Sequence, residues 1–330
     1  MTIPFSILDL SQVGEGYGVS EALANSARMA ARAEAAGYYR YWLAEHHGMP
    51  GIASAATAVV IAHVGAATKT IRVGSGGIML PNHSPLAVAE QFGTLEALFP
   101  GRVDLGLGRA PGSDMATARA LRRNLDNGVD TFPNDILELQ ALFGEPRPGR
   151  RIVATPGANA RVPLWLLGSS LYSAQLAAQL GLPYAFASHF APDLLFEALH
   201  IYRSHFRPSE TLAKPHTMVG VMGVAADTDE EARFQFTSMQ QSFANLHRHE
   251  RKPFPKPSYD AQLTPQEAAS IDSMLRYAMV GSPATIAERL GGFLRETAAD
   301  ELIVSMPIHD IEARLKSLDL FAGLRDALTA

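Results

Sequence analysis

Residues 71–107, IRVGSGGIMLPNHSPLAVAEQFGTLEALFPGRVDLGL, hold the unit that is repeated through the fold. The segment begins with a short β-like run, Ile71–Gly74, continues through a helical stretch, Pro85–Phe99, and ends in a second β-like run, Val103–Leu107. A strand, a helix and a strand in this order predict two parallel strands joined by a helical crossover.

The same alternation continues along the whole chain. The predicted strands are Phe5–Leu8, Arg40–Leu43, Ile71–Gly74, Val103–Leu107, Leu164–Leu167, Tyr184–Phe186, Met218–Val224 and Glu301–Val304. The predicted helices are Ser20–Ala36, Ser54–Lys69, Pro85–Phe99, Leu171–Leu180, Pro192–Phe206, Asp229–Ala244, Pro283–Thr297 and Ile311–Leu328. Eight such strands fit a closed α/β barrel, the (β/α)8 or TIM barrel, with its active site at the carboxyl ends of the strands. Because these barrels often reach this length as one unit, we predict a single domain over residues 1–330.

Two stretches interrupt the alternation. Residues 112–162 follow the fourth strand and contain a helical pattern near Asp135–Phe143. Residues 245–281 follow the sixth helix and contain a capping signature, Thr264 with Glu267, that predicts a further helix start. Loops of this length are usually lids or functional insertions, so we expect both on the active-site side of the barrel.

Composition excludes several classes of function. The chain carries 28 basic and 33 acidic residues without a block of Lys or Arg, so no nucleic-acid partner is expected. It has no cysteine, which excludes disulfides, zinc–thiolate sites, thiol nucleophiles and iron–sulfur clusters. It also lacks the long apolar run of a transmembrane helix, and its first residues do not resemble a signal peptide. We therefore expect a cytoplasmic protein without a membrane partner.

A titratable cluster, Glu45-His46-His47, follows the second predicted strand, where barrel enzymes carry catalytic groups. Adjacent histidines on an extended chain point to opposite faces, so at most one of them faces a shared centre. The alternatives are a structural, hydrogen-bonded role and a metal site. A metal would need further ligands, and none follows at a recognisable spacing, so no metal is predicted.

Glycines mark the ends of the third and fourth strands. Gly74, Gly76 and Gly77 indicate either a bulge, a surface that something flat approaches closely, or a flexible turn. The glycines of residues 106–112 do not form a dinucleotide-binding fingerprint, because the third glycine comes one place late and Pro111 would interrupt the amides of a helix start.

An anion site is predicted from two segments. Arg109 follows the fourth strand, and a serine-rich segment, Gly168-Ser169-Ser170, leads the fifth strand into a helix that also carries Ser173. Hydroxyls and backbone amides at a helix start bind phosphate well, whereas simple N-capping would need one serine. Arg109 with these serines predicts a mononucleotide phosphate site that has no Walker or Rossmann signature.

Four segments, each at a strand end or a helix end, resemble the bacterial luciferase-like family of flavin-dependent monooxygenases. They are Ala44–His47, Arg72–Pro81, Gly101–Arg109 and Ala177–Pro183, and the resemblance extends over nearly the whole chain. It implies a (β/α)8 barrel that binds reduced FMN.

The resemblance also implies roles for particular residues. The phosphate would be held by Arg109, Gly168, Ser169, Ser170 and Ser173, although luciferases have an acidic residue where this chain has Ser169. The pair Gly76-Gly77 would lie beneath the flavin ring and be joined by a cis peptide bond. His46 matches the histidine beside the reactive edge of the flavin and would act as the general acid or base, leaving His47 a mainly structural role.

The implied activity is oxygenation of a small organic substrate, such as an aldehyde or a ketone. Reduced FMN, supplied by a separate NAD(P)H-dependent flavin reductase, would activate O2 as a flavin C4a-(hydro)peroxide. Two alternatives remain, a deazaflavin (F420)-dependent oxidoreductase of the same fold and a non-catalytic flavin-binding protein. A homodimer through residues 54–69 and 85–99 is expected, because the first of these helices is apolar over more than one face.

Overall fold

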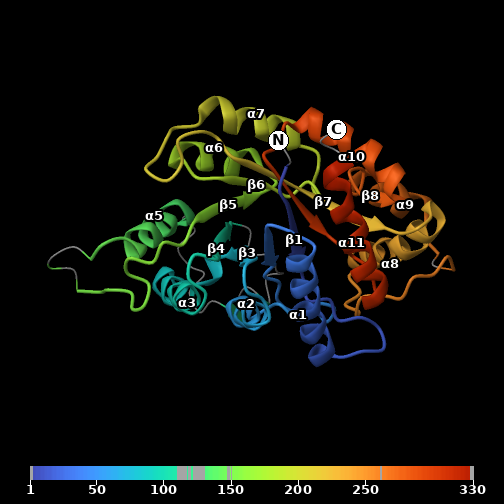
Figure 1. Cartoon of the computed structure of the whole chain (residues 1–330), viewed down its shortest axis with the longest axis horizontal. Helices are drawn as coiled ribbons and strands as arrows, with labels where there is room; N and C mark the ends of the chain where they lie inside the picture. The colour runs from blue at the N-terminus through green and yellow to red at the C-terminus, as the bar shows by residue number, and fades with distance from the viewer. Residues whose placement is uncertain are drawn as a thin grey trace.

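The structure is a computed structural model that describes residues 3–109, 117, 120–121, 131–146, 149, 151–260 and 262–327. Eight parallel strands close into a barrel, in which β1 to β7 follow one another and β9 joins β7 to β1 (Figure 1). They are β1 (Phe5–Asp9), β2 (Arg40–Leu43), β3 (Arg72–Met79), β4 (Val103–Gly108), β5 (Leu164–Gly168), β6 (Tyr184–Phe186), β7 (Thr217–Ala225) and β9 (Glu301–Ser305). The predicted (β/α)8 barrel is therefore confirmed.

Helices surround this barrel (Figure 1). They are α1 (Val19–Ala35), α2 (Thr57–Ala66), α3 (Pro85–Leu98), α5 (Phe132–Phe143), α6 (Leu171–Leu180), α7 (Leu195–His205), α8 (Asp229–His247), α9 (Pro265–Met274), α10 (Pro283–Thr297) and α11 (Ile311–Ala327), with a 3-10 turn at Leu80–Asn82. The helix start predicted from Thr264 and Glu267 is confirmed, because their side chains and backbone amides form the reciprocal capping box of α9.

A further strand, β8 (Met279–Gly281), was not predicted from the sequence. It pairs with Gly223–Ala225, the carboxyl-terminal part of β7, rather than within the closed barrel. Three residues are too few to show a strand period, so only the pairing with the long β7 makes this segment a strand. The segment after α8 thus returns to the sheet before α10 begins.

Alternate residues of the strands fill the barrel interior, as the two-residue period of a strand requires. Interior side chains form one apolar cluster that includes Leu8, Trp42, Trp165 and Met218. Their chain neighbours, such as Leu43, belong to the larger core between the strands and the helices. The interior is therefore packed, and a site can form only above it or below it.

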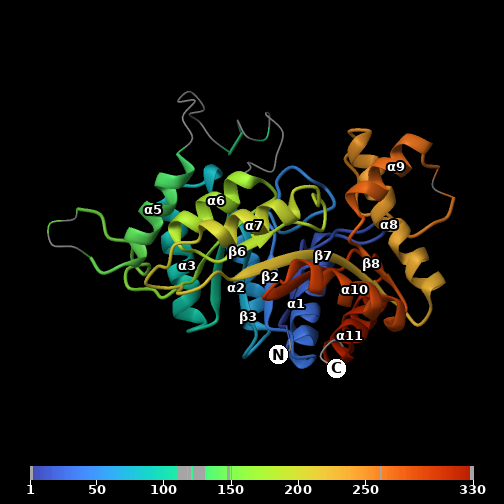
Figure 2. The ribbon, with the colours of Figure 1, turned by 90° about the horizontal axis from the view of Figure 1, so that it is seen from above.

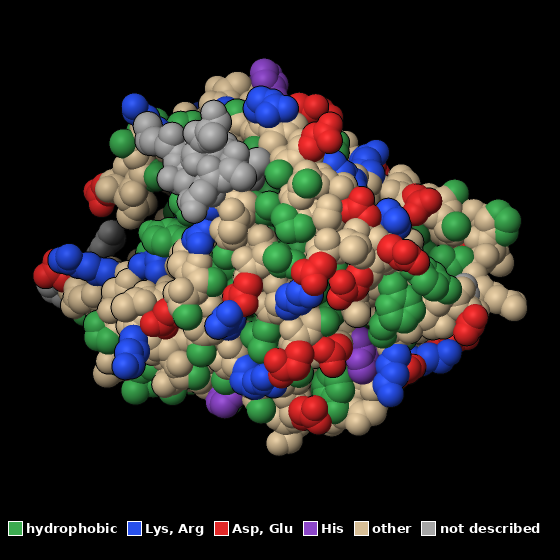
Figure 3. Space-filling model, turned by 45° about the vertical axis from the view of Figure 1, so that its right-hand side comes forward, with side chains coloured by type: hydrophobic (Ala, Val, Ile, Leu, Met, Phe, Trp, Pro, Cys, Tyr) green, Lys and Arg blue, Asp and Glu red, His purple; other side chains and the backbone are tan. Residues whose placement is uncertain are grey.

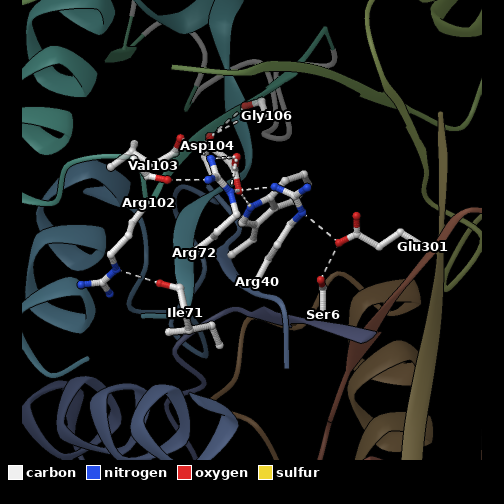
Figure 4. A network of polar contacts seen from close by, with 12 residues as sticks. Ser6, Arg40, Ile71, Arg72, Arg102, Val103, Asp104, Gly106 and Glu301 are labelled. Carbon is white, nitrogen blue, oxygen red and sulfur yellow. Dashed lines mark hydrogen bonds and ion pairs between the residues drawn. The ribbon is translucent and has the colours of Figure 1, made fainter. Parts of the chain in front are cut away.

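A buried ionic network closes the amino-terminal end of the barrel (Figure 4). Arg40 lies between two carboxylates, with Nη1 2.6 Å from Asp104 Oδ2 and Nε 2.8 Å from Glu301 Oε1. Arg72 Nη2 contacts the second oxygen of Asp104 at 2.6 Å, and the Ser6 hydroxyl donates to Glu301 at 2.6 Å. These residues begin their strands, so the network leaves the carboxyl end of the barrel for a site.

The chain ends and the excursions lie on opposite sides of the barrel. The two ends lie side by side, and α5 and α9 rise on the other side (Figure 2). On the face shown in Figure 3, acidic and basic side chains are interspersed, in line with the absence of a basic block in the sequence. In the described part of the chain, no helix combines the length and apolar character needed to cross a bilayer.

Candidate active site

The end of β2 brings a buried carboxylate between two histidines. Glu45 Oε1 lies 2.6 Å from His47 Nε2 and 2.8 Å from His83 Nε2, and Oε2 accepts the Met79 amide at 3.0 Å. Burial by itself would raise the pKa of Glu45, but the hydrogen bonds and charges of its partners hold that pKa below its ordinary value. Glu45 is therefore an anion that ties the end of β2 to the end of β3.

His83 supplies the third group of this cluster, which sequence spacing did not identify. One ligand atom from each of Glu45, His47 and His83 lies within 4.8 Å of the others, and two imidazoles with a carboxylate form a set that metals accept. In this structure, hydrogen bonds to Glu45 already engage Nε2 of both histidines. We interpret the cluster as a hydrogen-bonded network, and the absence of a metal stays a prediction.

A further histidine, His189, reaches the barrel mouth three residues after β6. Its ring covers the interior face of Gly220 on β7, where an added Cβ would lie 2.4 Å from Nδ1. Nδ1 is buried and has no hydrogen-bond partner within the described residues. Burial, aided by the nearby charge of His46, lowers the pKa of His189 to about 4. His46, half-buried at the end of β2, therefore has a neutral imidazole close to it.

Glycines line the interior of β3 and β4 below the mouth. The peptide bond between Gly76 and Gly77 is cis, as predicted. The register between β3 and β4 shifts between Ser75 and Ile78, as the first of the three interpretations, a bulge, would produce. A Cβ on Gly76 would lie 2.7 Å from the Leu8 side chain, and one on Gly77 would lie 2.7 Å from the Gly106 carbonyl oxygen. Packing within the barrel thus explains why both positions are glycine.

The predicted anion site comes together at the start of α6. The Arg109 guanidinium lies 4.3 Å from the ring centroid of Tyr172, in the first turn of that helix. Ser170 caps the helix, because its hydroxyl accepts the Ser173 amide at 3.4 Å. The buried Ser173 hydroxyl donates to the Ser170 carbonyl at 2.8 Å.

This donor set has the chemistry that a phosphate needs. A guanidinium, hydroxyls at the half-buried Ser169 and the exposed Ser170, and the amide end of a helix favour a dianion. Gly168 allows the turn, because a Cβ there would meet Ser173 Oγ at 2.3 Å. The structure therefore brings the predicted residues together, while their roles as cofactor ligands stay predictions.

A cavity of about 480 Å³ opens beside the cluster of Glu45, His47 and His83. Leu10, His47, Met49 and Ile52 line it, together with Phe243 of α8 and Phe254. Phe254 belongs to the excursion after α8, which the sequence placed on the active-site side. Leu10 also contacts the interior cluster of the barrel, so this cavity lies at the carboxyl ends of the strands.

A closed (β/α)8 barrel with titratable side chains gathered at the carboxyl ends of its strands has the architecture of a barrel enzyme. The chain belongs to the luciferase-like monooxygenase family, whose sequence pattern matches residues 3–301. It is 53% identical over 329 residues to the luciferase-like monooxygenase of Escherichia coli K12, a match that covers 99% of this chain and 98% of that protein. It is 36% identical over 244 residues, 72% of each chain, to a Bacillus subtilis protein named N-acetyl-S-alkylcysteine monooxygenase.

Solved structures agree with this assignment. The crystal structure of apo-MsnO8 is similar with a TM-score of 0.87 and 33% identity, and the match covers 98% of both chains. More distant structures share the fold alone. One is the oxygenating component of 3,6-diketocamphane monooxygenase in complex with FMN, with a TM-score of 0.71, 17% identity and coverage of 98% and 97%. Another is an F420-dependent secondary alcohol dehydrogenase, with a TM-score of 0.67, 14% identity and coverage of 99% of both chains.

Proposed function

We propose that this protein is an FMN-dependent monooxygenase that uses reduced FMN and O2 to oxygenate a small organic substrate. The observation that carries the proposal is the position of two sites at one end of the barrel. The Arg109 guanidinium and the start of α6 suit a phosphate, and His46 and His189 follow β2 and β6 at the same end of the barrel. Family membership makes oxidoreductase chemistry the expected use of this arrangement.

Each part of the site has a task in this proposal. Arg109, Ser169 and Ser170 would bind the cofactor phosphate, and Ser173 would hold the turn that presents the two hydroxyls. When bound, reduced FMN would supply the activation of O2. A separate NAD(P)H-dependent flavin reductase would deliver it as a transient partner.

His46 would hold or transfer a proton at the reacting centre. It is half-buried, and an imidazole is the side chain whose ordinary pKa lies closest to neutral pH. His189, kept neutral by burial, would act as a hydrogen-bond partner rather than as a second cation. The buried Glu45 with His47 and His83 would keep the end of β2 in place.

A direct test compares two cofactors and follows the oxygen atom. The purified protein is titrated anaerobically with reduced FMN and, separately, with reduced F420. Preferential binding of FMN, followed by transfer of one ¹⁸O atom from ¹⁸O2 into an added substrate, is the expected result. Tighter binding of F420 with hydride transfer would replace the proposal by the F420-dependent alternative. Binding of FMN without turnover of any substrate would favour a flavin carrier.

A further inference from the structure

The cavity at the carboxyl ends of the strands has walls that backbone hydrogen bonds hold together. Its three wall segments are far apart in the sequence. The Val13 amide donates to the Gly51 carbonyl at 2.9 Å, and the Phe254 amide donates to the Val13 carbonyl at 2.8 Å. Gln12 and Ile52 form an antiparallel bridge at the same place. A ligand would therefore meet a preformed space of about 480 Å³.

The turn that carries Gln12 is fixed by a buried ion pair. Ser11 has a positive φ of 50°, and its amide donates to Asp9 Oδ1 at 3.1 Å. Asp9 itself is fully buried and is held by Arg314 Nη2 at 2.7 Å. The position of Gln12 thus follows from a rigid contact at the end of β1.

Gln12 brings a side-chain amide to the cavity. The residue lines the cavity and is only 9% exposed, and its Oε1 atom is buried without a hydrogen-bond partner among the described residues. A buried amide that lacks a partner is unfavourable, so a ligand group that pairs with Gln12 is favoured. Rotation of the amide exchanges its oxygen and nitrogen atoms. A hydroxyl group matches either orientation, because it both donates and accepts.

His47 adds a hydrogen-bond acceptor to the same lining. Its ring lines the cavity, and its Nε2 atom lies 2.6 Å from Oε1 of the anionic Glu45. In the neutral imidazole the proton therefore lies on Nε2, where the carboxylate accepts the hydrogen bond, and Nδ1 is an acceptor. A ligand hydroxyl can donate to this nitrogen, whereas an ether or a carbonyl group cannot.

The inner part of the cavity disfavours a charged ligand group. Among the described residues that line the cavity, the charged side chains are all exposed to solvent, namely Glu250, Arg251 and Lys252. A charged ligand group beside the buried Gln12 would lose its water of hydration, which is unfavourable. The anionic Glu45 behind His47 adds repulsion for a carboxylate. The ligand group that meets Gln12 is therefore neutral.

Aromatic side chains enclose the apolar part of the cavity. Phe243 of α8 and Phe254 both line it and are buried. Met49 brings a thioether to the same lining. An aromatic ligand gains edge-to-face contacts with phenylalanine rings and a contact with the methionine sulfur, in addition to the burial of its apolar area.

We propose that this cavity binds the organic substrate and that the substrate is a neutral aromatic alcohol of the phenol class. Its hydroxyl pairs with Gln12 and His47, and its ring packs against Phe243 and Phe254. This proposal rests on the proposed function, because it supplies the substrate class for the same site. It differs from the aldehyde or ketone expected from the family resemblance, since neither carries a hydrogen-bond donor.

The test is equilibrium dialysis of the flavin-free, full-length protein at pH 7 with 2-naphthol and three matched probes. The methyl ether, 2-methoxynaphthalene, lacks the hydroxyl hydrogen, decahydro-2-naphthol lacks the aromatic rings, and 2-naphthoate carries a negative charge. We expect 2-naphthol to bind tightest. The methyl ether should bind roughly 3- to 10-fold more weakly, and decahydro-2-naphthol roughly 2- to 10-fold more weakly. The binding of 2-naphthoate should be weaker by about 10-fold or more.

Two variants assign the selectivity to residues. Gln12→Leu keeps the approximate volume of the side chain and removes its amide. His47→Gln keeps a polar group that can reach Glu45 and removes the ring acceptor. Each variant should reduce the preference for 2-naphthol over its methyl ether. Gln140→Leu, a half-buried glutamine on α5 that does not line the cavity, is the matched control and should behave as wild type.

The wild-type probe series decides the proposal even if a variant fails to fold. Equal binding of 2-naphthol and its methyl ether, tighter binding of 2-naphthoate or decahydro-2-naphthol, or no binding of 2-naphthol at micromolar concentrations would overturn it. An unchanged preference in both folded variants would also overturn it. So would displacement of 2-naphthol by added FMN, because the probe would then occupy the cofactor site.

The outcome is separate from that of the proposed function, because the probe series needs no cofactor. A protein with the predicted selectivity but no oxygenation would contradict the monooxygenase. A protein with oxygenation but no selectivity would contradict this substrate class.

Discussion

Arg40→Met would remove the cation at the centre of the ionic network that closes the barrel (Figure 4). Arg40 is 7% exposed and contacts Asp104 at 2.6 Å and Glu301 at 2.8 Å. Burial by itself would lower the pKa of Arg40, but the two carboxylates raise it, so the guanidinium stays charged. The substitution would therefore leave two buried carboxylates with less positive charge beside them.

The two carboxylates would be affected unequally. Asp104 would keep Arg72 at 2.6 Å, whereas Glu301 would keep the Ser6 hydroxyl and His216 at 3.5 Å. Removing one partner of a buried ion pair costs about 3–5 kcal/mol. We expect Arg40→Met to lower the free energy of unfolding by that amount, mainly through Glu301. Adding Glu301→Gln should recover part of the loss, because it removes the uncompensated charge.

Urea unfolding at pH 7, followed by circular dichroism, measures these differences. Arg32→Met is the control, because Arg32 pairs with Asp319 on the surface and should leave the midpoint nearly unchanged. An Arg40→Met midpoint equal to that of wild type at an unchanged m-value would refute the reasoning. So would a double variant that is less stable than Arg40→Met alone.

Four further predictions concern the site, stability and assembly. Arg109→Ala should weaken the binding of reduced FMN by about 1.5–3 kcal/mol in anaerobic calorimetry, and an unchanged dissociation constant would contradict the phosphate site. His46→Ala should still bind FMN while coupled turnover falls roughly 10²–10⁴-fold, and wild-type turnover would remove His46 from the mechanism. Burial lowers the pKa of His189 to about 4, so between about pH 6.5 and pH 4 a proton binds to this imidazole mainly in the unfolded state. The free energy of unfolding of wild type should therefore fall by up to about 3 kcal/mol by pH 4. His189→Gln should lack this part of the pH dependence in urea unfolding, and identical pH profiles of the variant and wild type would disprove the assignment to His189. Light scattering should give twice the 35.5 kDa mass of one chain. The reason is that Val59 on α2 and Leu98 on α3 are 69% and 59% exposed, and a second copy of the chain would cover these apolar side chains. The mass of a monomer would rule out the homodimer.

Features that depend on chain neighbours were predictable from the sequence. The barrel followed from the alternation of strand and helix patterns, and the α9 capping box followed from Thr264 and Glu267, which lie three positions apart. The order of the serines at the start of α6 and the position of His46 after β2 are likewise local. The rule that selected His46, a titratable side chain just past a barrel strand, applies equally to His189 and could have identified it.

Only the tertiary structure decided which remote groups meet. His83 reaches Glu45 because β2 and β3 pair in a particular register, and no spacing along the chain encodes that contact. Gln12 faces a cavity because Asp9, at the end of β1, pairs with Arg314 of α11 and because the segment after α8 folds back against Val13. A local pattern determines whether a residue lies in a strand, a helix or a turn. The partner of a buried charge or amide depends on the closure of the whole barrel, to which every strand contributes.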